Sequence, residues 1–245
     1  MLAAEILGLA PWEAVLAIVI VFVGSATQAS IGIGLGLMAA PTLSLIDPDF
    51  IPGAIAISVV PLSVGMAARE WDHVDPAIYR AVVGRVAGVL VGAWSVAQLG
   101  QELIAVVIGV SVLLAVLASA FGLRFAPTPR NLMIAGTTAG FTGTVAGVAG
   151  PPMALTYQHS DPRKLRASLA VFNTIGSAFI IPSLWFVGVI GRRELQLGLM
   201  LVPGILAGLY VGRHTITRIP ADRVRPFVLA VCSASALVLL GRQLG

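Results

Sequence analysis

The sequence is dominated by apolar runs that are too long and too sparsely charged to be covered by a water-facing surface. Of its 245 residues, 58% are hydrophobic and only 11% are charged, whereas soluble domains carry about 25% charged residues. A helix needs about 20 apolar residues to cross a bilayer. Because every backbone polar group in lipid must be paired internally, such runs must be helical. The chain is therefore predicted to be an all-α, multi-pass integral membrane protein.

Eight apolar runs are separated by short connections rich in Pro, Asp and Arg. The first, Pro11–Ile46, has 36 residues and a single charge. As one straight helix it would be about 54 Å long against a hydrocarbon core of about 30 Å, so we interpret it as a hairpin broken at its glycines. The run Leu132–Tyr157 is interpreted in the same way. The other runs are 51–68, 77–99, 103–125, 165–190, 195–211 and 224–240. Two arrangements follow: about eight spans, or ten membrane elements if both runs are hairpins.

The two halves of the chain repeat the same order of small residues. Gly32 falls on Gly143 at a shift of 111 residues, and the shift drifts slowly to 116 further along. An ordered series of this kind indicates two homologous halves, which is a common plan among transporters. We expect a first membrane repeat at 1–125 and a second at 126–245, together forming one domain.

The basic residues discriminate between the two arrangements. Eight single spans distribute them eight against seven, which the positive-inside rule does not favour. Two hairpins invert the second half, and one side then keeps only Arg192, Arg193 and Arg242 while the other holds 15 − 3 = 12. We therefore expect inverted repeats, with both termini outside. Asp49 would then lie on the same side as Glu5.

The glycine-rich motif GSATQASIGIGLGL of the first run is interpreted as a helix break at mid-membrane. Glycines there free backbone N–H groups, and the following half-helix begins with its positive dipole end at the break. Such a break can hold an anion without a charged side chain. The alternative is close helix packing by small residues. The candidate binding residues in this motif are Thr27, Gln28, Ser30, Gly32 and Gly34.

The motif GFTGTVAGVAGPP is the expected partner in the second half, and its Pro-Pro pair suits the first turn of a new helix. From opposite faces, two positive half-helix ends would converge on one small site. A buried asparagine and a serine four residues later share a helix face in the following run, and interhelical hydrogen bonding is their alternative role. The candidate binding residues of this half are Thr142, Gly143, Thr144, Gly147, Asn173 and Ser177.

Arg85 is the most membrane-embedded basic residue by its position in the run. We expect its guanidinium to snorkel to the cytoplasmic face; the alternative is that it marks the substrate path. Glycines spaced by four residues surround it, which is typical of a helix-packing face. Two such stripes occur, Gly84, Gly88, Gly92 and Gly204, Gly208, Gly212.

No residue pattern indicates an enzyme, a cofactor or a metal site. The histidines His73, His159 and His214 lie in connections without metal-ligand spacing, and no nucleophile–base arrangement or embedded carboxylate pair occurs. Cys232 is expected to be a small packing residue. The basic residues lie between the runs and form no single stripe, so nucleic-acid binding is not expected.

From Pro11 to Leu240 the chain resembles the TauE/SafE sulfite-exporter family (TSUP). The resemblance rests on the first glycine motif leading to Pro41, on its echo GTVAGVAGPPMAL and on the stretch HSDPRKLRASLAVFNTIGS. The resemblance implies a transporter of a bacterial inner membrane that carries sulfite or an organosulfonate such as sulfoacetate, and we transfer no binding residues from it. Such an oxyanion suits a site built from N–H and hydroxyl donors.

The sequence thus predicts a secondary transporter, an exporter of a small sulfur-containing anion bound between the two helix breaks. Alternating access would expose the anion to each side in turn. Coupling to a proton or to the membrane potential, contacts with membrane lipid, and assembly as a homodimer are left open. The alternatives are an anion channel built on the same breaks and a non-transporting membrane partner subunit.

Overall fold

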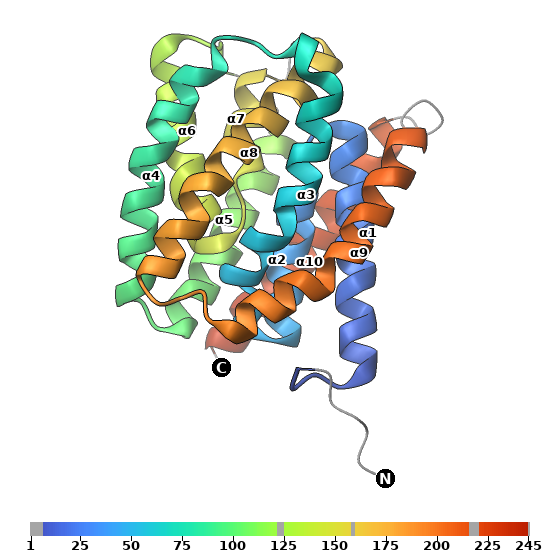
Figure 1. Ribbon diagram of the computed structural model, residues 1–245, viewed down its shortest axis with the longest axis vertical. Coiled ribbons are helices and arrows are strands. Elements are labelled where there is room, and N and C mark those ends of the chain that lie inside the picture. The colour runs from blue at the N-terminus through green and yellow to red at the C-terminus, as the bar shows by residue number, and fades with distance from the viewer. Residues whose placement is uncertain (1–6, 122–124, 158–159, 216–220, 245) are drawn as a thin grey trace.

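The computed structural model describes residues 7–121, 125–157, 160–215 and 221–244, and within them the chain forms a helical bundle without strands (Figure 1). The first half contributes α1 (Pro11–Ile31), α2 (Leu35–Ile46), α3 (Gly53–Glu70), α4 (Ile78–Gln98) and α5 (Gln101–Ala120). The second half contributes α6 (Pro129–Ala146), α7 (Gly150–Tyr157), α8 (Pro162–Phe186), α9 (Arg192–Thr215) and α10 (Ala221–Leu244). Short 3₁₀ turns at Pro48–Phe50 and Trp71–His73 flank α3. The predicted all-α class is confirmed.

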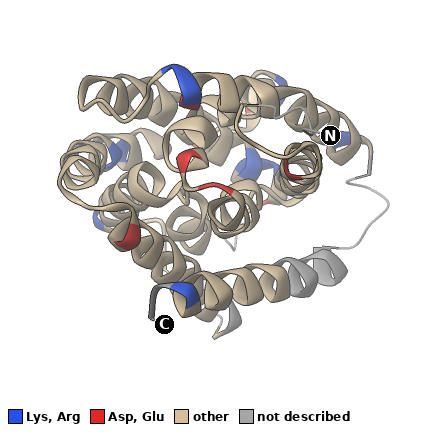
Figure 2. Ribbon diagram, turned by 90° about the horizontal axis from the view of Figure 1, so that it is seen from below, with Lys and Arg blue, Asp and Glu red and all other residues tan. Residues whose placement is uncertain are grey.

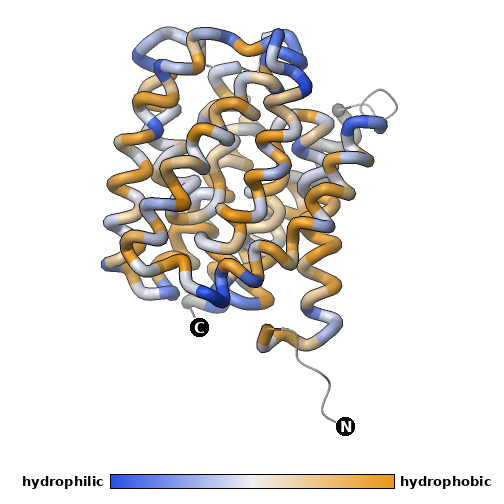
Figure 3. Tube along the Cα trace, in the orientation of Figure 1, coloured by the Kyte–Doolittle hydropathy of each residue, from blue (hydrophilic) through white to orange (hydrophobic). Residues whose placement is uncertain are grey.

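Six of the described helices are long and apolar enough to cross a membrane: α1, α3, α4, α5, α8 and α9. Hydrophilic residues gather at the two ends of the bundle, with hydrophobic residues between them (Figure 3). Figure 2, which views the bundle from below, shows how few charged residues the helices carry. Large apolar side chains point outward, among them Trp12, Trp94 and Phe186. An apolar exterior with its hydrophilic residues gathered at the two ends is suited to lipid, so the chain is a multi-pass membrane protein.

The run Pro11–Ile46 is a hairpin, and both of its ends lie at the same end of the bundle. Arg193, at the start of α9, pairs with the carboxylates of Asp47 and Asp49, which follow α2. The same guanidinium reaches the carbonyl of Leu7, which precedes α1, at 3.5 Å. Asp49 therefore lies at the same end as Leu7; Glu5 itself lies outside the described residues. We call this end of the bundle, at which α1 begins and α2 ends, the terminal end.

The second long run is also a hairpin, and it enters from the opposite end of the bundle (Figure 1). The N–H of Phe125, just before α6, donates to the carbonyl of Leu155 near the end of α7 at 3.3 Å. With both runs broken, the described residues form ten helices, as the hairpin arrangement predicts. The inverted relation of the two halves, and their division at residue 125, stay predictions.

Glycine stripes bring two pairs of helices into backbone contact. A Cβ on Gly88 of α4 would lie 2.1 Å from the carbonyl oxygen of Thr137 on α6. A Cβ on Gly208 of α9 would lie 2.3 Å from the carbonyl oxygen of Phe22 on α1. Any larger side chain would force these helices apart, so the packing role expected of both stripes is confirmed. Each hairpin is thereby fixed along its longer helix against one spanning helix.

Candidate functional site

The breaks of the two hairpins meet in the middle of the bundle. α1 ends at Gly32, whose φ of +91° is left-handed and whose N–H donates to the carbonyl of Gln28 at 2.8 Å. α6 ends in the same way at Gly147, with a φ of +70°. Left-handed backbone is accessible to glycine without a steric penalty, which explains why both helices stop there. A Cβ on Gly36, in the first turn of α2, would lie 2.3 Å from the carbonyl oxygen of Gly147.

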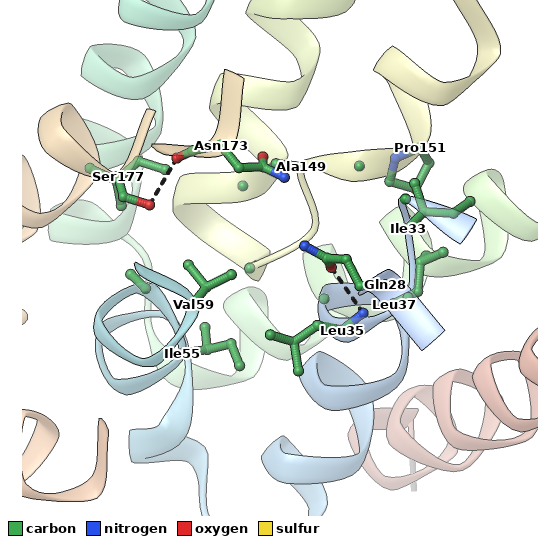
Figure 4. A pocket seen from close by; sticks show the side chains of 18 of the residues that line it. Gln28, Ile33, Leu35, Leu37, Ile55, Val59, Ala149, Pro151, Asn173 and Ser177 are labelled. Carbon is green, nitrogen blue, oxygen red and sulfur yellow. Dashed lines mark hydrogen bonds between the residues drawn. The ribbon is translucent and has the colours of Figure 1, made fainter. Parts of the chain in front are cut away.

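A cavity of about 60 Å³ lies beside this contact (Figure 4). Its walls come from both breaks and from α3, α4 and α8. The polar side chains that line it are those of Gln28, Arg85, Asn173 and Ser177, and no Asp or Glu is among the described residues around it. Apolar side chains of α3 and α8, including Ile55, Val59 and Ile180, close the remainder. The lining is therefore poor in acceptors and carries one positive charge.

The two amide side chains of the cavity are oriented by their neighbours. The Oε1 of Gln28 accepts from the N–H of Leu35 at 3.1 Å, across the first break. The Oδ1 of Asn173 accepts from Arg85 at 3.0 Å. Because each amide oxygen is held by a donor, the amide nitrogen must point the other way. In Figure 4 both nitrogens face the space between the two residues. The cavity thus presents two N–H₂ groups toward its centre.

Backbone N–H groups add to this set of donors. The first four N–H groups of a helix have no acceptor within the helix, and Leu35, Gly36 and Leu37 of α2 all line the cavity. Gln28 accepts the N–H of Leu35, so those of Gly36 and Leu37 are the ones left for a ligand. The positive end of the α2 dipole lies at the same place, which favours an anion.

Arg85 does not snorkel, so that expectation is wrong. Only 3% of the residue is exposed. Its Nη1 donates to the carbonyl of Phe172 at 3.1 Å and to Asn173, its Cζ lies 4.2 Å from the centroid of the Phe172 ring, and its Nε has no hydrogen-bond partner. Gly176 makes the space, since a Cβ there would lie 1.9 Å from Nε. Among the described residues no carboxylate pairs with this guanidinium.

The structure brings seven of the eleven candidate residues together around the cavity. They are Gln28, Gly32, Gly34, Gly143, Gly147, Asn173 and Ser177. The Ser177 hydroxyl donates to the carbonyl of Asn173 at 3.0 Å, so its proton is already used within α8. The contribution of each residue to substrate binding is a proposal developed below.

The other four candidates, Thr27, Ser30, Thr142 and Thr144, direct their hydroxyls to backbone carbonyls outside the cavity lining. Thr27 bonds to Val23 and Thr144 to Gly140, each one turn earlier in its own helix. The Ser30 hydroxyl lies 3.1 Å from the Gly212 carbonyl of α9. The Thr142 hydroxyl lies 2.6 Å from the carbonyl of Val148 and so spans the second break. In a dry environment a helix carbonyl is the nearest acceptor, and these hydroxyls use it.

Sequence reasoning anticipated the free N–H groups at the start of α2, but it expected Arg85 at the cytoplasmic face and kept the substrate path only as the alternative. The sequence signal for Arg85 was its depth in the apolar run, and embedded charges usually mark functional sites. Within the described residues, no group of three or more His, Cys, Asp or Glu side chains could hold a metal ion.

Comparison with protein families gives one finding that agrees with this geometry. A family model described as "Sulfite exporter TauE/SafE" matches residues 16–239 of the chain, which include both helix breaks and all the cavity-lining residues. Searches of curated proteins and of solved structures gave no match.

Proposed function

Because the chain belongs to the TauE/SafE sulfite exporter family, we propose that the cavity between its two helix breaks is the site at which a small sulfur oxyanion is bound and carried. As a family member the chain is a sulfite exporter-type membrane transporter. The substrate, the binding residues and the direction of transport are the parts that we propose.

The observation that carries the proposal is a buried, unpaired guanidinium in a cavity lined by donors. A charge in the membrane interior is expensive unless it is paired, and Arg85 has no carboxylate partner among the described residues. A bound anion would supply the missing charge. Arg85 also holds Asn173, whose amide nitrogen faces that of Gln28 (Figure 4). These groups together surround an oxyanion with N–H donors.

The size of the cavity favours sulfite over an organosulfonate. Its volume is about 60 Å³, and apolar side chains such as those of Ile55, Val59 and Ile180 form much of its wall. Sulfoacetate would bring a second charged group, a carboxylate, against that apolar wall, where burying an unpaired charge is costly. Sulfite places all its oxygens within one donor shell.

The proposed direction is export. Under the positive-inside rule the end of the bundle that holds most of the arginines faces the cytoplasm, and the terminal end faces outside. An inside-negative potential then drives an anion outward. A coupling proton stays an open part of the proposal.

The test is uptake of labelled sulfite and sulfoacetate into liposomes carrying the purified protein, with and without imposed pH and potential gradients. Arg85→Gln and Asn173→Leu are expected to reduce saturable sulfite uptake by about tenfold or more each, since removing a charge-assisted hydrogen bond loses about 1.5–3 kcal/mol. Thr144→Val is the matched control because its hydroxyl bonds to the Gly140 carbonyl outside the cavity.

Three outcomes separate the parts of the proposal. Saturable uptake with counterflow, lost in Arg85→Gln and Asn173→Leu and kept in Thr144→Val, supports transport through this cavity. Saturable uptake that survives in all the variants would keep the transporter and refute the site. High conductance without saturation would identify a channel instead.

A further inference from the structure

The structure holds a second, larger cavity at the end of the bundle opposite the terminal end. It has a volume of about 690 Å³ and is lined by residues of α1, α3, α8 and α9 and by the turn after α3. We call it the vestibule. Its charged and titratable lining residues are Arg69, Glu70, His73, Arg163, Arg166 and Arg213. With four arginines against one glutamate, its walls attract anions whatever the protonation state of the histidine.

Arg166 lies between the vestibule and the lining of the central cavity. Arg166 lines the vestibule, and only 8% of it is exposed. Its side-chain stem packs against Gly32 of the first break, where an added Cβ would lie 3.2 Å from the Arg166 Cγ. Gly32 lines the central cavity. Arg166 thus contacts both the vestibule and a residue of the central cavity, and an anion passing between the cavities near Gly32 would pass next to it.

Glu70, the salt-bridge partner of Arg166, lacks some of the hydrogen bonds that its carboxylate could accept. Both Nε and Nη2 of Arg166 donate to the same oxygen of Glu70, at 3.2 and 2.9 Å. The second carboxylate oxygen of Glu70 is buried and has no hydrogen-bond partner. A buried acceptor without a partner is destabilising, so this ion pair is weaker than a two-oxygen pairing would be. An oxyanion, which matches the guanidinium fork with two oxygens, could replace the carboxylate.

We propose that the vestibule is a second oxyanion-binding site, weaker than the central one. Arg166 would release Glu70, bind the anion in its place and so bring it toward the central cavity. This inference rests on the proposed function, since the vestibule would supply the same sulfur oxyanion to the central cavity. The shared chemistry of the two sites is a guanidinium facing an oxyanion. They differ in hydration, because the vestibule arginines Arg69, Arg163 and Arg213 are exposed.

Equilibrium binding of labelled sulfite to the purified, detergent-solubilised full chain tests the inference. Wild type should bind two sulfite ions, and the weaker binding should fall steeply as salt is raised, because exposed charges are screened. Arg213→Gln should weaken that site several-fold and reduce its salt dependence. The matched control is Arg80→Gln, which removes an exposed arginine from α4 that does not line the vestibule.

A second variant tests the exchange at Arg166 without removing a basic residue. Glu70→Gln keeps the size and an acceptor oxygen but removes the competing charge, so the weak site should bind sulfite several-fold more tightly. An unchanged dissociation constant in this variant would refute the exchange role of Arg166. A single binding site that neither Arg213→Gln nor salt affects would refute the vestibule site itself.

Failure of the vestibule proposal can be distinguished from failure of the transport proposal. Asn173→Leu should remove the tighter binding and leave the weak, salt-sensitive binding in place. If liposomes carrying wild type take up no sulfite under any gradient, the transport proposal fails, and the binding titration still decides the vestibule. If uptake is normal but Arg213→Gln binds sulfite as Arg80→Gln does, only the vestibule proposal fails.

Discussion

The two hairpins share one plan but differ in the chemistry of their breaks. Each has a long helix that ends at a left-handed glycine and a short helix that returns to the side of entry. The short helix of the first hairpin, α2, has 12 residues and a first turn with all its N–H groups. That of the second, α7, has 8 residues and begins GPP, so two N–H donors are missing from its first turn.

The side chains at the two breaks also differ in the hydrogen-bond donors that they leave free. Gln28 accepts from the α2 backbone and leaves an amide donor in the cavity. Thr142 spans the second break by reaching the Val148 carbonyl, and its hydroxyl is then occupied. The first hairpin therefore presents donors to the cavity, whereas the second presents fewer and forms the surface that the first packs against. Two hairpins of the same plan can therefore differ in the chemistry of their breaks.

The largest effect is expected where the two breaks touch. Gly36→Ala would place a Cβ 2.3 Å from the carbonyl oxygen of Gly147, and backbone cannot yield as a flexible side chain would. We expect a loss of about 1–3 kcal/mol of stability from overpacking, together with loss of sulfite uptake. Thermal unfolding in detergent and liposome uptake measure the two effects.

Gly100→Ala is the matched control for that substitution, because an added Cβ there meets nothing within 4 Å. If Gly36→Ala behaves like Gly100→Ala, the two breaks are not in contact and the comparison between them loses its basis.

A smaller effect separates the roles of the two breaks. Gln28→Leu should reduce the uptake efficiency kcat/KM by about tenfold, since it removes a cavity donor and leaves the Leu35 N–H without its partner. Thr142→Val should instead lower stability by about 1 kcal/mol, the contribution of a typical hydrogen bond, with little change in KM. Uptake kinetics and thermal unfolding of both variants give the answer. Equal kinetic losses would mean that both breaks bind the substrate.

The smallest effect is expected from returning a donor to the second break. Pro151 lines the cavity and has no N–H, so Pro151→Ala adds one donor at the start of α7. We expect the KM for sulfite to fall by about two-fold, less than a full neutral hydrogen bond provides, because α7 is short. Competition uptake against wild type resolves a change of this size. A higher KM would show that the rigidity of the proline pair matters more than the donor.

Local sequence signals were enough for the helices and their breaks. Apolar runs of membrane-spanning length predicted the helices, and the excess length of Pro11–Ile46 and Leu132–Tyr157 predicted the hairpins. The glycines at positions 32 and 147 marked the breaks because left-handed backbone is a property of the residue itself. The distribution of basic residues favoured the two hairpins over eight single spans. None of these inferences needs knowledge of a distant neighbour.

The tertiary structure alone decided which polar groups face the cavity. Threonines and serines at the breaks read alike in sequence, but each hydroxyl turns to whichever carbonyl its helix or neighbour presents. Arg85 lies in the cavity because α8 offers the Phe172 carbonyl, the Asn173 amide and the space at Gly176, all about 90 residues away along the chain. The vestibule joins residues of α1, α3, α8 and α9 in the same way. The direction of a side chain depends on packing between helices, and the sequence periodicity of a single helix does not reveal that packing.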